Sequence, residues 1–214
     1  MHCTTGRCRE SLESAHRVWL QHSEHLVAVV DPGSGELAVV PGALASGPLV
    51  WWQGKLRTQQ GLALEYAVAL EEALRDQGIR GVLTACGQRL GSVTGRVYRL
   101  DAAEAEVSIS LHFLSSFHRR DRGFAVTAGG DRALPFAWGL WSELCRYLPC
   151  QSEPWVDTPA GSLPRSGGGL AVHIGLGHIT SSLDMRLIME PYWKLRVTEG
   201  LAGVMERYLS VEDK

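Results

Sequence analysis

A stretch of strict alternation near the middle of the chain is the feature that most constrains the fold. Across residues 106–113, apolar side chains occupy every second position, and Ser or His fill the positions between them. Successive side chains of a β-strand point to opposite faces of a sheet, so the pattern predicts a strand with one apolar and one polar face. Val107, Ile109, Leu111 and Phe113 form the apolar face, which must be covered by a core.

Two amphipathic helices are predicted to supply that cover. The first spans 58–77, carries its apolar residues on one stripe and is followed by Gly78, which suits a helix end. The second spans 131–148, with Pro135 in its first turn, where the missing backbone N–H does no harm. Shorter helices are expected at 11–21 and 198–209.

The remaining predicted strands are joined mostly by turns. The runs 26–30 and 36–40 flank Asp31-Pro32-Gly33-Ser34-Gly35, which predicts a β-hairpin. Further strands are expected at 49–52, 79–85, 92–100, 170–174 and 185–189. Because strict β-α-β alternation is absent, we expect an α+β fold with a mainly antiparallel sheet and helices packed on one face.

Length and one Pro/Gly-rich segment set the expected domain organisation. A chain of 214 residues is sized for a single domain. Residues 1–148 are expected to form the main α+β body, and 149–169 a Pro/Gly-rich loop or linker. Residues 170–214 are too few to bury a core alone, so we expect them to return onto the body as a β-α segment.

Charge and hydropathy exclude several classes of protein. The formal net charge is -2, so there is no overall basic surplus to hold a polyanion, and 45% hydrophobic residues exclude global disorder. The uncharged run 37–54 is interrupted by Pro and Gly, which argues against a membrane span. The first residues show no apolar secretion signal and the five cysteines are sparse, so we expect a cytoplasmic protein.

Four of the five cysteines form two pairs with the same spacing. Four residues separate Cys3 from Cys8, and four separate Cys145 from Cys150. Short spacings of this kind can direct two thiolates at one tetrahedral zinc ion, so a structural zinc joining the two pairs is one hypothesis. Free thiols and a disulfide are the alternatives, and no other cofactor is expected.

Cys86 and two histidines form a candidate catalytic group. Cys86 follows a predicted strand and precedes Gly87, whose N–H could stabilise an oxyanion. His173 and His178 are the candidate bases. The Val-His-Ile-Gly stretch around His173 resembles the histidine strand of papain-like thiol hydrolases, which implies acyl transfer by a Cys/His pair. A Cys/His-dependent hydrolase or transferase is therefore one alternative function.

A basic run at 117–124 predicts a second alternative. Arg119, Arg120 and Arg122 lie there between Phe117 and Phe124. Arginines that contact phosphates and aromatic rings that stack on bases are typical of nucleic-acid-binding loops. The alternatives for this run are a nucleic-acid-binding module and a solvated loop.

An excess of tryptophan favours a third interpretation. The chain has seven Trp, and indoles are enriched at the centres of protein interfaces. Trp51 and Trp52 would point to opposite faces of a strand, Trp155 lies in the Pro/Gly-rich segment, and Trp193 follows a Pro-Tyr pair. With no coherent catalytic set, we expect a non-catalytic interaction or adaptor subunit of a larger assembly. Its expected partner is another protein or a second copy of the chain, and not a membrane.

Overall fold

A six-stranded sheet lies at the centre of the computed structural model, which describes residues 27–32, 49–84, 105–118, 120–150, 152–156 and 169–212. In spatial order its strands are β4 (Arg80–Leu83), β1 (Val27–Pro32), β5 (Val107–Leu114), β8 (Leu170–His178), β6 (Ala125–Ala128) and β7 (Trp155–Val156). A separate hairpin pairs β2 (Leu49–Trp52) with β3 (Lys55–Thr58).

The six-stranded sheet is mixed, and parallel pairs prevail among the described strands. β1 runs parallel to β4 and to β5, β5 runs parallel to β8, and β6 runs parallel to β7, whereas β6 and β8 are antiparallel. The expectation of a mainly antiparallel sheet is therefore not confirmed. The prediction that the run 26–30 pairs with the run 36–40 in a hairpin is wrong. The first run forms β1, and the parallel strands β4 and β5 occupy both edges of β1. Residues 36–40 lie outside the described ranges.

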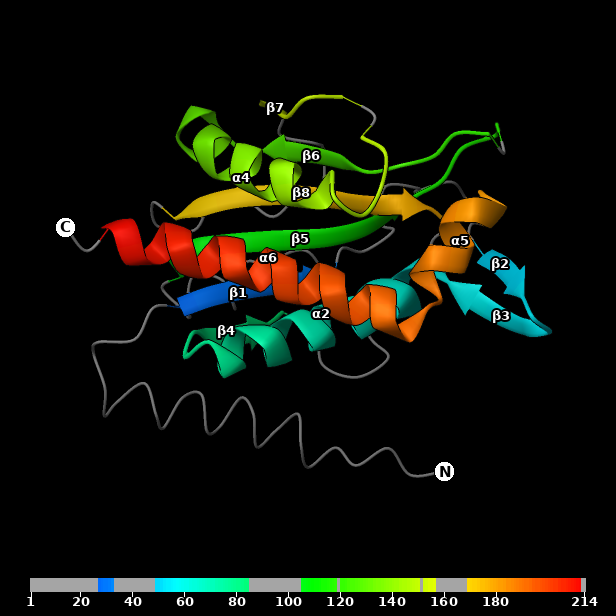
Figure 1. Ribbon diagram of the computed structural model, residues 1–214, viewed down its shortest axis with the longest axis horizontal. Helices are drawn as coiled ribbons and strands as arrows, with labels where there is room; N and C mark the ends of the chain where they lie inside the picture. The colour runs from blue at the N-terminus through cyan, green and yellow to red at the C-terminus, as the bar shows by residue number, and fades with distance from the viewer. Residues whose placement is uncertain are drawn as a thin grey trace, which may run out of the picture.

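The described long helices pack on one face of this sheet. α2 (Gln59–Asp76), α4 (Leu134–Leu144) and α6 (Pro191–Glu212) form the layer, and α6 lies between the other two (Figure 1). The short helix α5 (Ser182–Ile188) follows β8, and a 3₁₀ turn, η1 (Asp131–Ala133), precedes α4. The hairpin β2-β3 lies at the same end of the molecule as α5 (Figure 1).

The core lies between the helical layer and the sheet. The apolar residues of the alternating stretch in β5 are all buried there, and so is every second residue of β8 from Val172 to Leu176. Tyr66 of α2 is fully buried among them, and its hydroxyl donates to the carbonyl oxygen of Ile188 at 2.7 Å. The period-two prediction for β5 is therefore confirmed.

Local sequence signals explain where α2 begins and ends and where α5 begins. The Thr58 side chain accepts a hydrogen bond from the N–H of Gly61 at 2.8 Å and caps α2. Gly78 follows the helix with a φ of 77°, a left-handed conformation that favours glycine. The predicted strand at 185–189 is wrong, because these residues belong mostly to α5, whose N-cap is Ser181.

Several expectations fall on residues that the structure does not describe. The helix at 11–21 and the strand at 92–100 lie outside the described ranges, and so does the middle of the Pro/Gly-rich segment. The division of the chain into 1–148, 149–169 and 170–214 stays a prediction. Among the described residues, no helix combines the length and the apolar character needed to cross a membrane.

Candidate active site

A strip of polar and small side chains lies on the sheet face that the described helices leave uncovered. Its members, called the polar strip below, are Ser108, Ser110 and His112 of β5, Thr127 of β6, and Ala171, His173 and Gly175 of β8. They share one face because Ser110 pairs with His173 and His112 pairs with Gly175 in the parallel register. All of them are buried except His112, which is partly exposed.

Two imidazoles come together in the polar strip. The ring centroids of His112 and His173 are 6.3 Å apart, with the ring planes at 42°. Imidazole has an ordinary pKa of about 6.5, so it can take up and release a proton near neutral pH, and it is also a common metal ligand. The pair can therefore act in acid–base chemistry or in holding an ion.

The position opposite His112 carries no side chain. A Cβ atom at Gly175 would lie 2.5 Å from Cδ2 of Leu114, so the Leu114 side chain occupies that space. The polar strip as described contains imidazole and hydroxyl groups and no carboxylate. Its chemistry must therefore depend on the two histidines or on groups outside the described residues.

The described residues alone do not form a metal centre. A catalytic zinc ion is held by three protein ligands as a rule, and no three His, Cys, Asp or Glu side chains gather in the ranges that the structure describes. A metal at His112 and His173 would need a third ligand from the rest of the chain.

The zinc hypothesis for the two cysteine pairs stays a prediction. Cys3 and Cys8 lie outside the described residues. Cys145 and Cys150 are described, exposed and not joined in a disulfide.

The Cys/His candidates occupy separate places where the structure describes them. Cys86 lies outside the described residues. His173 belongs to the polar strip, whereas His178 ends β8 five residues later, about 16 Å along an extended strand. Burial lowers the pKa of His178, although Asp184 and Asp121 oppose this shift. The two histidines therefore do not serve one reaction centre.

A buried carboxylate organises the end of β8. Asp184, in the first turn of α5, is fully buried, and its Oδ1 accepts a hydrogen bond from Nε of Arg122 at 2.9 Å. Its Oδ2 accepts from the backbone N–H groups of Gly123 at 2.8 Å and His178 at 3.1 Å. Asp184 thus ties the β5–β6 loop and the end of β8 to α5.

This contact changes the interpretation of the basic run at 117–124. Arg122 is engaged by Asp184, Arg120 is exposed, and Arg119 lies outside the described residues. Asp121 follows Arg120 directly and adds a negative charge to the run. Nucleic-acid binding by this loop stays a prediction, with Arg122 explained by its structural ion pair.

The four tryptophans assigned to partner binding differ in exposure. Trp51 is 72% exposed and Trp155 is 42% exposed, whereas Trp52 is partly buried. Trp193 is only 8% exposed, and its ring packs edge-on against Tyr66 with centroids 6.0 Å apart. The expectation that Trp193 contacts a partner is corrected, because this indole belongs to the core.

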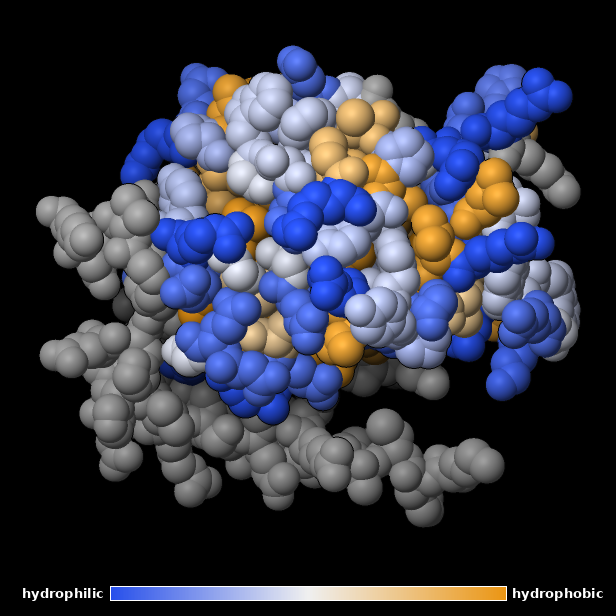
Figure 2. All heavy atoms as spheres, viewed as in Figure 1, coloured by the Kyte–Doolittle hydropathy of each residue, from blue (hydrophilic) through white to orange (hydrophobic). Residues whose placement is uncertain are grey.

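Apolar surface gathers near the exposed hairpin. Trp51 lies opposite Leu56 in the β2-β3 register, and Leu56 is 49% exposed. Leu183 of α5 is also 49% exposed, and hydrophobic surface is visible at this end of the helical face (Figure 2). Partner binding through Trp51 stays a prediction, but the exposure that it requires is present.

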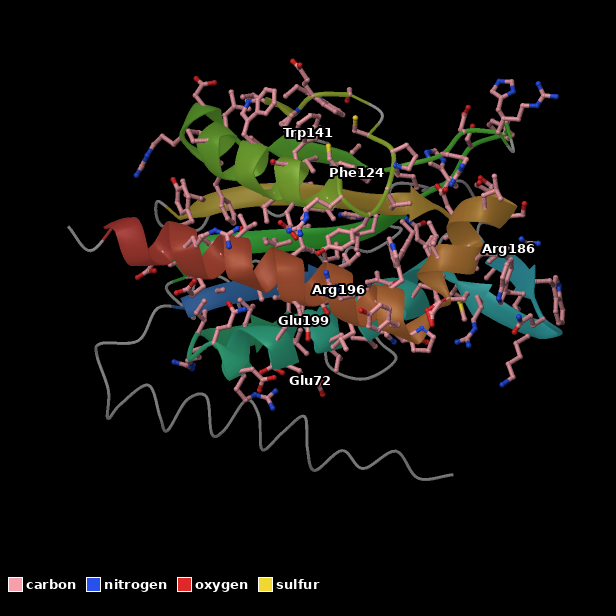
Figure 3. The ribbon with its side chains drawn as sticks, in the orientation of Figure 1. Glu72, Phe124, Trp141, Arg186, Arg196 and Glu199 are labelled. Carbon is pink, nitrogen blue, oxygen red and sulfur yellow. The ribbon has the colours of Figure 1, made fainter. Side chains whose placement is uncertain are left out.

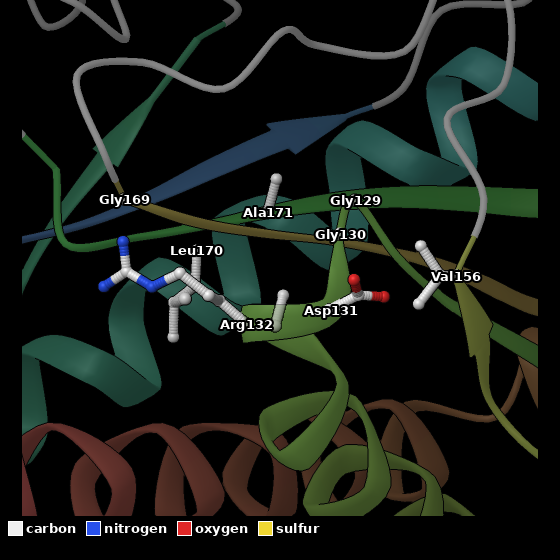
Figure 4. Close-up of a pocket in the computed structure, with 9 residues that line it drawn as sticks. Gly129, Gly130, Asp131, Arg132, Val156, Gly169, Leu170 and Ala171 are labelled. Carbon is white, nitrogen blue, oxygen red and sulfur yellow. The ribbon is translucent and has the colours of Figure 1, made fainter.

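A pocket of 360 Å³ opens at the Ala171 end of the polar strip (Figure 4). Gly129, Gly130 and Gly169 line it together with Asp131 and Arg132, whose side chains point toward opposite sides. Sequence reasoning did not predict this pocket, and it did not assign His112 to a site. The sequence signal that could have found His112 was the alternation at 106–113. This alternation identified the buried apolar face of β5, and it also puts His112 on the opposite, polar face.

Known structures share this architecture. No protein family description and no curated protein sequence matches the chain. The catalytic domain of CwlV, an N-acetylmuramoyl-L-alanine amidase from Bacillus (Paenibacillus) polymyxa var. colistinus, matches with a TM-score of 0.73 at 21% identity, over 87% of this chain and 99% of that one. The chain shares the fold of this catalytic domain, called the amidase fold from here on. An N-acetylmuramoyl-L-alanine amidase from Clostridium difficile 630 shares the amidase fold with a TM-score of 0.74 at 19% identity, over 88% and 98% of the two chains.

The amidase fold overturns the expectation of a non-catalytic interaction or adaptor subunit. The two structures named above are N-acetylmuramoyl-L-alanine amidases, and the shared part spans nearly the whole of each of those two chains. The expectation was wrong because it rested on tryptophan count, which does not distinguish a core indole such as Trp193 from an exposed one. The hydrolase alternative agrees better with the amidase fold.

Protein partners do occur within the amidase fold. The CwlD amidase from Clostridioides difficile was solved in complex with the GerS lipoprotein. It matches this chain with a TM-score of 0.71 at 14% identity, over 87% of this chain and 100% of that one. A protein partner is therefore compatible with the fold.

Proposed function

We propose that the protein is an amide hydrolase that acts on a peptide joined through an amide bond to an amino sugar, the linkage of N-acetylmuramoyl-L-alanine. The observation that carries this proposal is the match to CwlV, which extends over 87% of this chain and 99% of that catalytic domain. We propose the polar strip as the substrate site, because it gathers polar side chains on the sheet face that the described helices leave uncovered.

We assign the proton transfers to His112 and His173. Amide hydrolysis requires a proton to leave the attacking water and another to reach the departing amine. Imidazole can perform both transfers near neutral pH, and a centroid separation of 6.3 Å lets one substrate contact both rings. The hydroxyls of Ser110 and Thr127 offer hydrogen-bonding groups along the same face.

Release of a free alanine amine from a muramoyl-L-alanyl peptide tests the proposal. We expect the purified chain to release the amine, and we expect H112A and H173A each to lose about 100-fold or more in rate. H118A is the matched control, because His118 is an exposed histidine of the β5–β6 loop and should leave the rate unchanged. The assay is run once with a chelator and once with added zinc. A difference in rate between the two would show that the reaction depends on a metal, held in part by residues outside the described ranges.

The proposal fails if the wild-type chain binds the peptide and releases no amine across the neutral pH range, with or without added metal. It also fails if H112A and H173A retain the wild-type rate. Binding is measured separately by calorimetry, so that loss of binding and loss of hydrolysis can be distinguished.

Trp51 and Trp155 are proposed as contacts for a protein partner or a second copy of the chain. Their exposure of 72% and 42% supports this proposal, as does the existence of a protein complex within the fold. Sedimentation of the wild type and of W51A tests self-association. A monomeric wild type over the accessible concentration range removes the second copy as the partner.

A further inference from the structure

Two free thiols lie on either side of the turn that follows α4, away from the histidines assigned to hydrolysis. Cys145 is the residue that ends α4, and Cys150 follows it after one turn. Both side chains are exposed, neither is in a disulfide, and only one turn of the chain separates them. We propose that Cys145 and Cys150 are a redox modification site, which closes to an intramolecular disulfide by exchange with a small-molecule disulfide such as oxidised glutathione.

The helix end holds Cys145 in place. Its N–H donates to the carbonyl oxygen of Trp141 at 3.0 Å, as in the preceding turns of the helix. The N–H of Leu148 donates to the carbonyl oxygen of Leu144 at 3.1 Å, and both leucine side chains are buried. The turn between the two cysteines is therefore anchored in the core on one side while the thiols face solvent.

The sheet edge holds Cys150 in place. Cys150 forms an isolated parallel bridge with Phe124, and the N–H of Phe124 donates to the carbonyl oxygen of Pro149 at 3.1 Å. Two residues beyond Cys150, the carbonyl oxygen of Ser152 accepts from Nε1 of Trp141 at 2.8 Å. Phe124 and Trp141 both lie in the part of the molecule formed by β6 and α4 (Figure 3).

Two exposed thiols on either side of one anchored turn can close into a disulfide with little movement of the backbone. A disulfide requires the two Cα atoms to lie within about 7 Å with the side chains directed at each other, and strain makes the bond easier to reduce. Among the described residues no third metal ligand joins the pair. Thiol chemistry is therefore the use that this arrangement supports.

The exchange balances without a metal. The Cys150 thiolate attacks one sulfur of the small disulfide, forms a mixed disulfide and expels one thiolate, which takes up a proton. The Cys145 thiolate then attacks the Cys150 sulfur and expels the second. The protein loses two hydrogens, and one molecule of oxidant becomes two thiols.

The reverse order, in which Cys145 attacks the small disulfide first, balances in the same way. Desolvation and the neighbouring Cys150 raise the pKa of the Cys145 thiol. The thiolate is the attacking species in either order, so closure should become faster as the pH rises.

A variant that retains only this pair provides the test. C3S/C8S/C86S is incubated with excess oxidised glutathione at mildly alkaline pH, and the free thiols are then alkylated. We expect a product that has lost two hydrogens, retains no free thiol and carries no glutathione. Addition of C145S or of C150S to this background should instead trap a mixed disulfide with glutathione.

Trypsin gives an independent readout on the wild-type chain, which covers the case in which the triple variant does not fold. Arg146 lies between Cys145 and Cys150, so cleavage after it places the two cysteines in separate peptides. The closed form yields these peptides as one linked species that separates on reduction. Closure should also raise the melting temperature by roughly 5 °C. Accumulation of glutathione on both cysteines of the pair, without linked peptides, would overturn the proposal.

Discussion

Replacement of Asp184 by Asn tests the anchor at the end of β8. The fully buried carboxylate accepts hydrogen bonds from Arg122, Gly123 and His178. Asn has nearly the same size but replaces one acceptor oxygen with an NH₂ group, which only donates. Whichever way the amide turns, an N–H donor of the protein then faces another donor.

The expected loss is about 3 kcal/mol in the free energy of unfolding. A hydrogen bond to a charged group contributes about 1.5–3 kcal/mol, and breaking a buried ion pair on one side costs about 3–5 kcal/mol. When the new NH₂ group faces Arg122, the Arg122 side chain, which is 36% exposed, can be hydrated, so the loss in stability lies at the lower end of these ranges. When the NH₂ group instead faces Gly123 and His178, these two residues lose their acceptor, at about 1–3 kcal/mol for each N–H group.

Urea unfolding followed by tryptophan fluorescence measures this loss. With a slope of about 2–3 kcal/mol/M for a chain of this size, the midpoint should fall by about 1 M. D76N is the matched control, since Asp76 is an exposed carboxylate at the end of α2, away from the Asp184 anchor. Its effect should stay within about 0.5 kcal/mol.

A double-mutant cycle separates the ion pair from the rest of the anchor. D184N and R122Q should be coupled by at least about 1 kcal/mol, because each removes the same contact. A D184N loss below about 1 kcal/mol, or the absence of coupling, would refute the assignment of Asp184 as the anchor.

Three further substitutions have outcomes that follow from the structure. G123A should destabilise the protein by more than about 3 kcal/mol in urea unfolding, because Gly123 has a φ of 94° and its Cβ would lie 2.0 Å from the carbonyl oxygen of Pro149. G54A, at a φ of 75° with no atom within 4 Å, should cost only about 1 kcal/mol, and equal losses would contradict the argument. His178 has a lowered pKa when folded, so the unfolded chain takes up its proton first, and stability should fall as the pH drops below about 6.5. H178Q should flatten this slope in unfolding curves collected from mildly alkaline to acidic pH, and an unchanged slope would assign the pH dependence to other groups.

The elements that local chemistry determines were predictable from the sequence. The alternation at 106–113 placed Ile109 and its neighbours in the core, and Thr58 and Gly78 lie at the ends of α2 as expected. These predictions depend on period and capping, which are properties of neighbouring residues. The parallel pairing of β1 with β5 joins Ala28 to Val107, and no local pattern reports such a distant contact.

The candidate site required the same distant information. His112 and His173 were both visible in the sequence as strand residues, but their proximity depends on the register between β5 and β8. Asp184 was not predicted at all, because a single carboxylate in a short helix carries no pattern that separates a buried acceptor from an exposed one. The interpretation of Trp193 failed for the opposite reason, since its place beside Pro191 and Tyr192 suggested a loop and α6 includes all three.

The position of β8 in the sheet has a consequence for synthesis. β8 lies between β5 and β6 but follows both of them along the chain. A nascent chain that ends at β7 therefore leaves one edge of β5 open to foreign strands. The apolar residues that α6 later covers stay accessible for the same period, and surfaces of this kind attract chaperones. The sheet is therefore completed only after β6 has left the ribosome, when β8 is synthesised and inserts between β5 and β6.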